Sequence, residues 1–185
     1  MKALKFIILV IMLTSCVRGL GNEPATKIGF TEIEKGIKDK FGNNAYYTNL
    51  LISYDKSIGN IVSVTVTKKP SSLKMGRWNQ SQGSWKQNQD ISIEVPDGSK
   101  ASDFMFQLNE HLNLKKLGEL TEKSSKQLTT EKNIENPTLS MAFVKFPKTG
   151  DMSNTEYIII LKPETGGTSF TFRYKLNGNL IKMDY

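Results

Sequence analysis

Cys16 and His111 are the residues best suited to nucleophilic catalysis or metal binding, since the sequence has a single cysteine and a single histidine. Zinc centres usually take three or four protein ligands, mostly His and Cys, so one of each is too few. A His-based catalytic triad needs a serine and an acid beside the imidazole, and the sequence has no GxSxG nucleophile motif. We therefore predict no metal centre and no cofactor, and interpret His111 as a partly exposed helix residue.

Carboxylates are spread along the chain and form no recognisable motif; Asp90, Glu94, Asp97 and Glu156 are examples. A glycosidase-type pair needs two acids within about 5–10 Å, which folding could create between positions distant in sequence. A carboxylate-based hydrolase is therefore one hypothesis, although no pattern in the sequence favours it.

Both tryptophans lie within residues 74–89, KMGRWNQSQGSWKQNQ, where aliphatic residues are almost absent. Trp offers a flat apolar face with one N–H donor, and Trp and Arg are enriched where proteins bind their partners. We predict a contact surface formed by Arg77, Trp78, Trp85 and Lys86, which would bind a protein, a peptide or a glycan. The alternative is a long hairpin whose two tryptophans cover the edge of a sheet as part of the core.

The N-terminus has the pattern of an export leader. Lys2 and Lys5 precede an apolar run at residues 6–13, which is shorter than the roughly 20 residues that span a bilayer. The next residues, 13–16 (LTSC), resemble the lipobox of bacterial lipoprotein signal peptides. The resemblance implies cleavage before Cys16, a diacylglycerol on its thiol, and acyl chains such as palmitate that anchor the protein in a lipid bilayer. The alternative is an ordinary secretory signal with a cysteine near the cut by chance.

The residues after Cys16 bear on where such an anchored protein resides. An aspartate at this position tends to retain enterobacterial lipoproteins in the inner membrane, whereas this chain has Val17. Some Bacteroidetes lipoproteins carry an acidic run here for surface display, but residues 17–24 (VRGLGNEP) contain Glu23 as their only acidic residue. The resemblance therefore implies a cell-envelope protein at the outer membrane, facing the periplasm.

The chain has a formal net charge of +7, and loss of Lys2 and Lys5 with the leader would lower it to +5. A basic balance is typical of nucleic-acid-binding proteins. The lysines are dispersed, however, and an exported protein seldom meets nucleic acid, so we predict no nucleic-acid partner. We expect anionic lipid headgroups or acidic glycans as neighbours, unless the lysines simply solvate the surface.

We divide the chain into a signal peptide (residues 1–15), a lipidated cysteine with a flexible tether (16–27) and one folded domain (28–185). A domain of this size buries about 70% of its unfolded surface, which is enough to fold without disulfides. The order of the elements predicted below indicates two halves, 28–98 and 99–185, as in a tandem α-β-β-β repeat.

Helix and strand patterns alternate in the first half. Thr31 and Glu34 have the spacing of a capping box at the start of a helix over residues 32–41. Period-two alternation of apolar and polar residues then predicts strands at residues 46–54, 61–67 and 91–95.

A similar order follows in the second half. Phe104, Leu108 and Leu112 have helical spacing, whereas residues 114–136 lack a clear period and are predicted to be a partly helical connection. We predict strands at residues 138–146, 156–161 and 169–176, the last with aromatic residues on one side and Arg173 and Lys175 on the other. An Asn177-Gly178 hairpin turn returns the chain along residues 180–185.

These elements predict an α+β fold, with an antiparallel sheet and helices packed on one face. Fold does not give activity. We favour a non-enzymatic binding or accessory lipoprotein of the cell envelope, with an envelope protein or a glycan as partner. The alternative is an inhibitor of a secreted or envelope enzyme, which would use a protruding loop at residues 71–84.

Overall fold

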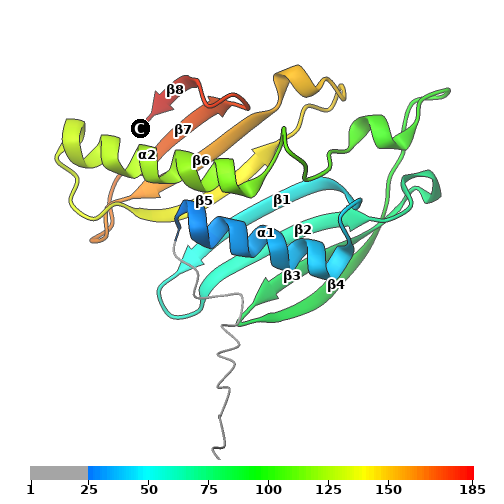
Figure 1. The fold of residues 1–185 in the computed structure, drawn as a ribbon, viewed down its shortest axis with the longest axis horizontal. Helices are drawn as coiled ribbons and strands as arrows, with labels where there is room; N and C mark the ends of the chain where they lie inside the picture. Colours follow the sequence, from blue (N-terminus) through cyan, green and yellow to red (C-terminus); the bar gives the residue numbers. More distant parts are fainter. Residues whose placement is uncertain (1–24) are drawn as a thin grey trace, which may run out of the picture.

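The computed structural model describes residues 25–185, so the predicted leader and Cys16 lie outside the described residues (Figure 1). The described part has two α-helices, α1 (Lys27–Phe41) and α2 (Leu114–Lys132). Its eight strands are β1 (Tyr46–Asp55), β2 (Gly59–Thr67), β3 (Lys74–Ser81), β4 (Ser84–Ser92), β5 (Thr138–Lys145), β6 (Glu156–Lys162), β7 (Phe170–Lys175) and β8 (Leu180–Asp184). Neither of these helices is both long and apolar enough to cross a bilayer.

All eight strands form one antiparallel sheet in the order β4-β3-β2-β1-β5-β6-β7-β8. Each half of the chain is a helix followed by a four-stranded meander, and the two meanders meet where β1 pairs with β5 through Ile52 and Ala142. The predicted α+β class with an antiparallel sheet is confirmed. The first half has one strand more than the α-β-β-β unit that the sequence predicts.

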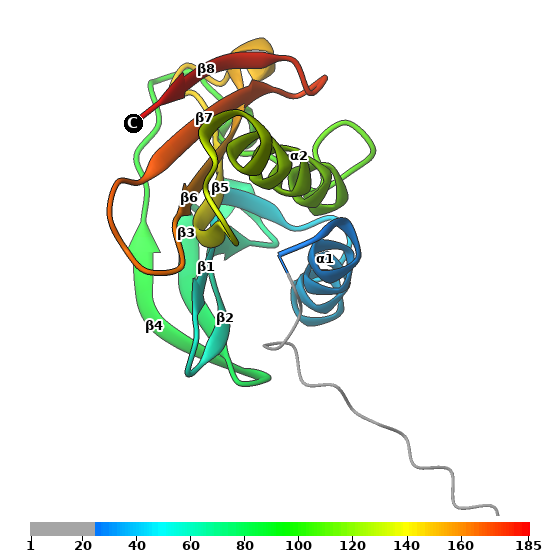
Figure 2. The same ribbon diagram turned by 90° about the vertical axis from the view of Figure 1, so that its left-hand side faces the viewer.

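Both helices lie against the same face of the sheet (Figure 2). Strand residues alternate between the two faces, so every second side chain points at the helices. The core between these layers is formed mainly by Phe30, Ile33, Ile37, Leu50, Ile52, Val62, Val64, Leu117, Leu128, Ala142, Tyr157, Ile159, Phe172 and Tyr174.

Helix α1 begins earlier than predicted. Thr26 is its N-cap, with a side chain that accepts a hydrogen bond from the Gly29 amide at 3.2 Å. The predicted cap, Thr31, lies inside the helix and donates to the Lys27 carbonyl oxygen. The helix ends at Gly42 as predicted, where φ is 93°, a value that favours glycine.

Residues 74–92 form a hairpin of two strands, β3 and β4, where the sequence predicted a polar stretch and a short strand at 91–95. Gln82 and Gly83 make the turn, with φ values of 48° and 78°, as a tight two-residue hairpin turn requires. The predicted protruding loop at residues 71–84 is therefore wrong, because most of it is paired strand.

The helix predicted around residues 104–112 is absent. Phe106 pairs with Tyr47 by two backbone hydrogen bonds of 2.8 and 2.9 Å, which extends the sheet locally. Asn109 Oδ1 then accepts hydrogen bonds from the amides of His111 and Leu112, which stabilises a tight turn. Leu108 and Leu112 are buried, but from this turn and not from a helix.

Helix α2 occupies residues predicted to be only partly helical. Its buried stripe contains Gly118, Thr121 and Ser124 among leucines. The Thr121 and Ser124 hydroxyls donate to carbonyl oxygens one turn earlier, so they can be buried without leaving an unpaired polar group.

The strands predicted in the second half are confirmed to within one residue at every end. The turn at Asn177-Gly178 is also present, but only Gly178 has positive φ, and a bulge in β8 follows it. The other edge strand, β4, pairs with β3 through a bulge as well.

A smaller apolar cluster of Met75, Ala101 and Met105 lies apart from the main core. Together the two clusters involve every helix and most strands of residues 25–185. This part of the chain therefore contains the hydrophobic core it needs to fold on its own.

Candidate functional site

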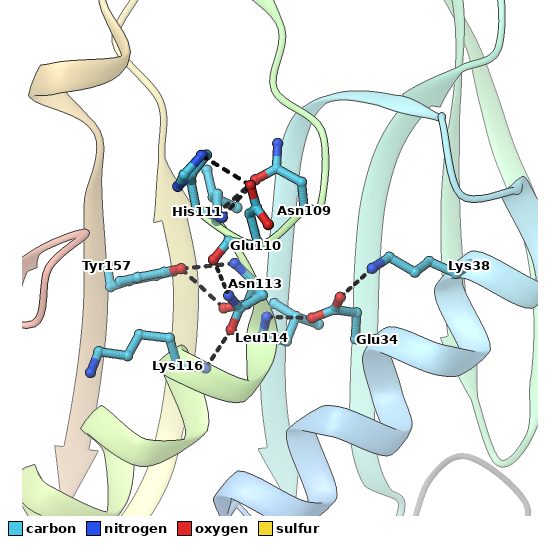
Figure 3. Close-up of polar contacts among 10 residues, drawn as sticks. Glu34, Lys38, Asn109, Glu110, His111, Asn113, Leu114, Lys116 and Tyr157 are labelled. Atoms are coloured by element: carbon cyan, nitrogen blue, oxygen red, sulfur yellow. Dashed lines mark hydrogen bonds and ion pairs between the residues drawn. The ribbon is translucent and has the colours of Figure 1, made fainter.

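The densest group of polar contacts lies where α2 begins (Figure 3). Asn113 is the N-cap, and its side chain accepts a hydrogen bond from the Lys116 amide at 2.8 Å. Glu34 reaches across from α1, and its Oε2 accepts from the Leu114 amide at 2.7 Å. Because the first amides of a helix lack partners within it, Glu34 acts as a second cap and joins the two helices.

Tyr157 on β6 fixes the same turn to the sheet. Its hydroxyl accepts a hydrogen bond from the Asn113 amide and donates one to the Asn113 carbonyl oxygen, both at 3.0 Å. Burial, opposed by the hydrogen bond with the Asn113 backbone and supported by the nearby Glu34 carboxylate, raises the pKa of Tyr157 to about 12. The phenol is therefore neutral at physiological pH and works as a hydrogen-bonding group.

Above this junction lies an open cleft of about 480 Å³ between α1 and residues 109–115. Its lining combines amides with charged groups: Thr31, Glu34, Lys35, Lys38, Asp39, Asn43, Asn109, Glu110, Asn113 and Lys115. Glu34 Oε1 also pairs with Lys38 Nζ at 2.5 Å. Since both oxygens of Glu34 are engaged, this carboxylate stabilises the helix junction and is not placed to act as a general base.

The single histidine lies at the rim of this cleft. His111 Nε2 is 3.4 Å from Glu110 Oε1, and the two side chains are 80% and 85% exposed. Within residues 25–185, no group of three His, Cys, Asp or Glu side chains could hold a metal ion. Exposed groups of this kind offer hydrogen bonds to a ligand but no water-excluded site for acid–base chemistry.

Trp78 and Trp85 are neighbours, on the face of the β3–β4 hairpin that the helices cover. Both rings meet Phe41 of α1 edge to face, with centroids 5.6 and 5.0 Å from the Phe41 ring. Lys40 Nζ also lies 4.9 Å from the centroid of the Trp78 ring. The two tryptophans are half-buried against the core. This arrangement matches the alternative hypothesis, in which both tryptophans cover the sheet as part of the core.

Arg77 and Lys86 lie on the opposite face of the same hairpin, because each is adjacent to a tryptophan in its strand. Both are exposed. The four residues predicted to form one contact surface are thus divided between two faces of the sheet. Arg77 and Lys86 belong to the face that carries no helix, which we call the open face.

The open face has apolar side chains at its centre and basic ones around them. Pairing of the strands assigns to this face the apolar residues Leu51, Ile61, Met141, Phe143, Ile158 and Ile160. The same pairing assigns the basic residues Arg77, Lys86, Lys145, Lys162, Arg173, Lys175 and Lys182 and the acidic residues Asp55, Glu156 and Asp184. Basic groups clearly outnumber acidic ones here.

Glu156 organises the charges on the β5–β7 side of this face. It accepts two hydrogen bonds of 2.9 Å from Arg173, one from Nε and one from Nη2. Lys145 Nζ approaches its other side at 3.5 Å. Within the described residues, by contrast, Arg77 and Lys86 take part in no ion pair, so their charges are available to a partner.

The sequence analysis did not identify three residues around which the polar contacts are organised: Glu34, Tyr157 and Glu156. Glu34 and Tyr157 act on a helix terminus far away in the sequence, so no local pattern could have shown their roles. The alternation in residues 170–175 does place Arg173 opposite the buried aromatic residues. This alternation is the sequence feature that indicates a basic side of the sheet, opposite the aromatic core.

Comparison with known proteins identifies the fold alone. No protein-family model matches the chain, and no curated protein matches its sequence. A solved structure from Clostridium difficile 630, described as a putative lipoprotein (CD1622), superposes with a TM-score of 0.51. The alignment has 13% identity and covers 84% of this chain and 91% of the other. At this identity the two proteins share an architecture, and the likeness shows no activity.

Proposed function

We propose that this protein is a cell-envelope lipoprotein whose α+β domain is a non-enzymatic binding module. The observation that carries the proposal is the leader with LTSC at residues 13–16, which places the single cysteine directly after an apolar run. The description of the structurally similar protein as a putative lipoprotein supports it. Acylation of Cys16 would anchor the domain, since two or three acyl chains hold a protein firmly in a bilayer.

The location that we propose is the outer membrane, with the domain facing the periplasm. Val17 in place of an aspartate supports this location, as does the segment after Cys16, whose one acidic residue, Glu23, is balanced by Arg18. The tether before α1 would keep the domain close to the leaflet.

The arrangement of polar groups supports binding over catalysis. Glu34 is committed to the Leu114 amide and Lys38, and the Tyr157 hydroxyl to the backbone of Asn113. Glu156 is committed to Arg173 and Lys145. The sheet, by contrast, presents a face that neither α-helix covers (Figure 2), and only the end of this face at Met75 is covered, by residues 91–105. We propose Arg77 and Lys86 as contact residues on it, with Trp78 and Trp85 fixing the hairpin from the other side.

Mass spectrometry of the mature N-terminus tests the anchoring step. We expect a chain that begins at Cys16 and carries diacylglycerol, and a Cys16→Ser variant that is uncut and lacks the lipid mass. Fractionation should place the wild type in the membrane fraction. A bare thiol at Cys16, or a wild-type chain that keeps residues 1–15, would overturn the proposal.

A further inference from the structure

The open face differs from the usual solvated face of an antiparallel sheet, which is mostly polar. Leu51 and Phe143 lie opposite each other on β1 and β5, and Phe143 pairs in turn with Ile158 on β6. Leu51 and Phe143 are partly accessible, whereas neighbouring side chains leave only 5% of Ile158 exposed. An apolar strip therefore runs across the middle of a face that no helix covers.

Basic side chains border this strip on both sides. Arg77 and Lys86 border it on β3 and β4, and Lys175 and Lys182 border it on β7 and β8. Between Arg77 and Lys86 lies Asn79, whose Oδ1 is buried without a hydrogen-bond partner in the described structure. An apolar centre with a charged rim is the anatomy of a protein–protein interface.

The start of α1 indicates which way this face would point in an anchored protein. Gly118 of α2 lies directly against Thr26 and Lys27, so the described chain begins within the helix layer. The ten residues that separate Cys16 from Lys27 can span at most about 35 Å. Anchoring through Cys16 therefore favours the helix layer near the leaflet and the open face toward the aqueous side.

The positive charge argues against a second copy of the chain on this face, and the position of α1 argues against a lipid leaflet. Two copies of the chain would bring like-charged surfaces together, which is unfavourable. A lipid leaflet would have to lie on the side away from the start of α1. An acidic protein surface would complement the positive charge of the open face and could approach it from the aqueous side.

We infer that the open face is a docking surface for an acidic region of another envelope protein. The inference rests on the proposed function, because it names the class of partner that this binding module would take. Leu51 and Phe143 supply apolar contact at the centre, and Arg77 and Lys86 supply charge complementarity.

Site-specific photocrosslinking of the full chain in its own host tests the inference. A photoreactive p-benzoylphenylalanine replaces Ser63, which lies on the open face beside Leu51 and Asn79. The matched control replaces Lys126, which is exposed on α2. We expect a protein adduct from position 63 alone, with an acidic peptide of the partner at the crosslink.

Charge reversal then tests the electrostatic part. Arg77→Glu with Lys86→Glu should lower the adduct yield about tenfold, because like charges would face each other. Lys123→Glu with Lys126→Glu makes the same charge change on α2 and should leave the yield unchanged. Thermal unfolding of the purified 25–185 segment of each variant checks that it folds, and a charge-reversed acid in the partner's crosslinked peptide should restore the adduct.

Four results would overturn the inference: equal adducts from both positions, a lipid adduct, a dimer of this chain, or a yield that charge reversal does not change. The absence of any adduct would overturn it as well. Mass spectrometry of Cys16 in the same cells separates these outcomes from failure of the anchor, because an acylated chain without docking refutes only the docking surface.

Discussion

The two halves of the sheet have the same layout but are joined to their helices by different chemistry. In the first half, Phe41 of α1 packs edge to face on Trp78 and Trp85. In the second half, Tyr174 on β7, the counterpart of β3, shares a 2.8 Å hydrogen bond with Ser124 of α2. The layout of helix and meander therefore determines which helix and strand positions are in contact. An aromatic contact or a hydrogen-bonded pair of side chains can occupy those positions.

The halves also depend on each other, because each helix start has one cap of its own and one from the other helix. Asn113 and Glu34 of α1 cap the start of α2. Thr26 caps the start of α1, where Glu122 of α2 also accepts a hydrogen bond from the Lys27 amide at 3.2 Å. Four predictions test this comparison, from the largest expected effect to the smallest.

Phe41→Ala should remove the aromatic contact of the first half. Loss of a buried Phe typically costs about 3–5 kcal/mol of unfolding free energy. Both tryptophans of the chain contact Phe41, so their fluorescence should shift to the red in the folded variant. Urea unfolding followed by fluorescence measures both effects, and a cost below about 1 kcal/mol would show that the tryptophans are held by other contacts.

Raising the pH should weaken the second half through Tyr157. The pKa of Tyr157 is higher in the folded state, so folding favours the neutral phenol. This contribution to the free energy of unfolding is fully present below pH 10, the ordinary pKa of the group, and is lost as the pH rises through about 12. The loss should reach about 2 kcal/mol near pH 12. Tyr157→Phe is the control: it should be less stable at pH 7 but show a shallower decline in urea unfolding between pH 9 and 12. An equal decline would assign the effect to other groups.

Gly118→Ala should destabilise the contact between the two helices. A Cβ at this position would lie 2.6 Å from the Thr26 carbonyl oxygen and 2.8 Å from the Lys27 Cα. Overpacking of this kind costs about 1–3 kcal/mol, whereas Gly→Ala inside a helix normally stabilises it by up to about 1 kcal/mol. The sign of the change in melting temperature therefore tests the close approach of the two helices at Gly118, with Ser125→Ala as the control on the same helix.

Tyr174 and Ser124 should show a small coupling in a double-mutant cycle. Tyr174→Phe or Ser124→Ala alone should each cost about 1 kcal/mol, because each removes a buried hydrogen bond. The double variant should cost less than the sum of the two, since no partner is then left unpaired. Additive costs in urea unfolding would mean that the hydrogen bond contributes little to joining α2 to the sheet.

Strands with strict alternation could be predicted from sequence, and elements with polar buried positions could not. In β7 the covered face is formed by Phe170, Phe172 and Tyr174, with Thr171 and Arg173 between them, which gives a clear period of two. On β3 and β4 the covered face includes Gln80 beside the tryptophans, and this glutamine is buried. The polar residue hides the period, so the sequence indicates a hairpin here only as the alternative to a contact surface.

The helices show the same effect. Helix α1 has an apolar stripe of Ile33, Ile37 and Phe41 and was predicted, although its start was not. In α2 the stripe is interrupted by Thr121 and Ser124, which are buried because their hydroxyls bond within the helix. The spacing around residues 104–112 was helical, but pairing with Tyr47 and the turn at Asn109 decided the structure.

For the candidate site, the sequence placed Arg77, Trp78, Trp85 and Lys86 in one segment but could not assign their faces. A face depends on strand register, and register depends on pairing with β2 and on the turn at Gln82-Gly83. The location of Cys16 in the leader pattern needs no tertiary structure, so it was accessible from the sequence. Acylation of Cys16 is still a prediction.

For a domain anchored to a membrane as we propose, the bulges in β4 and β8 limit contact between neighbouring molecules. Molecules tethered to one leaflet collide far more often than molecules in free solution, and an unprotected sheet margin would let neighbours polymerise strand by strand. Local distortion of both outer strands, with charged and amide side chains along β4, makes such stacking unfavourable. Each molecule would then stay a separate unit at high surface density.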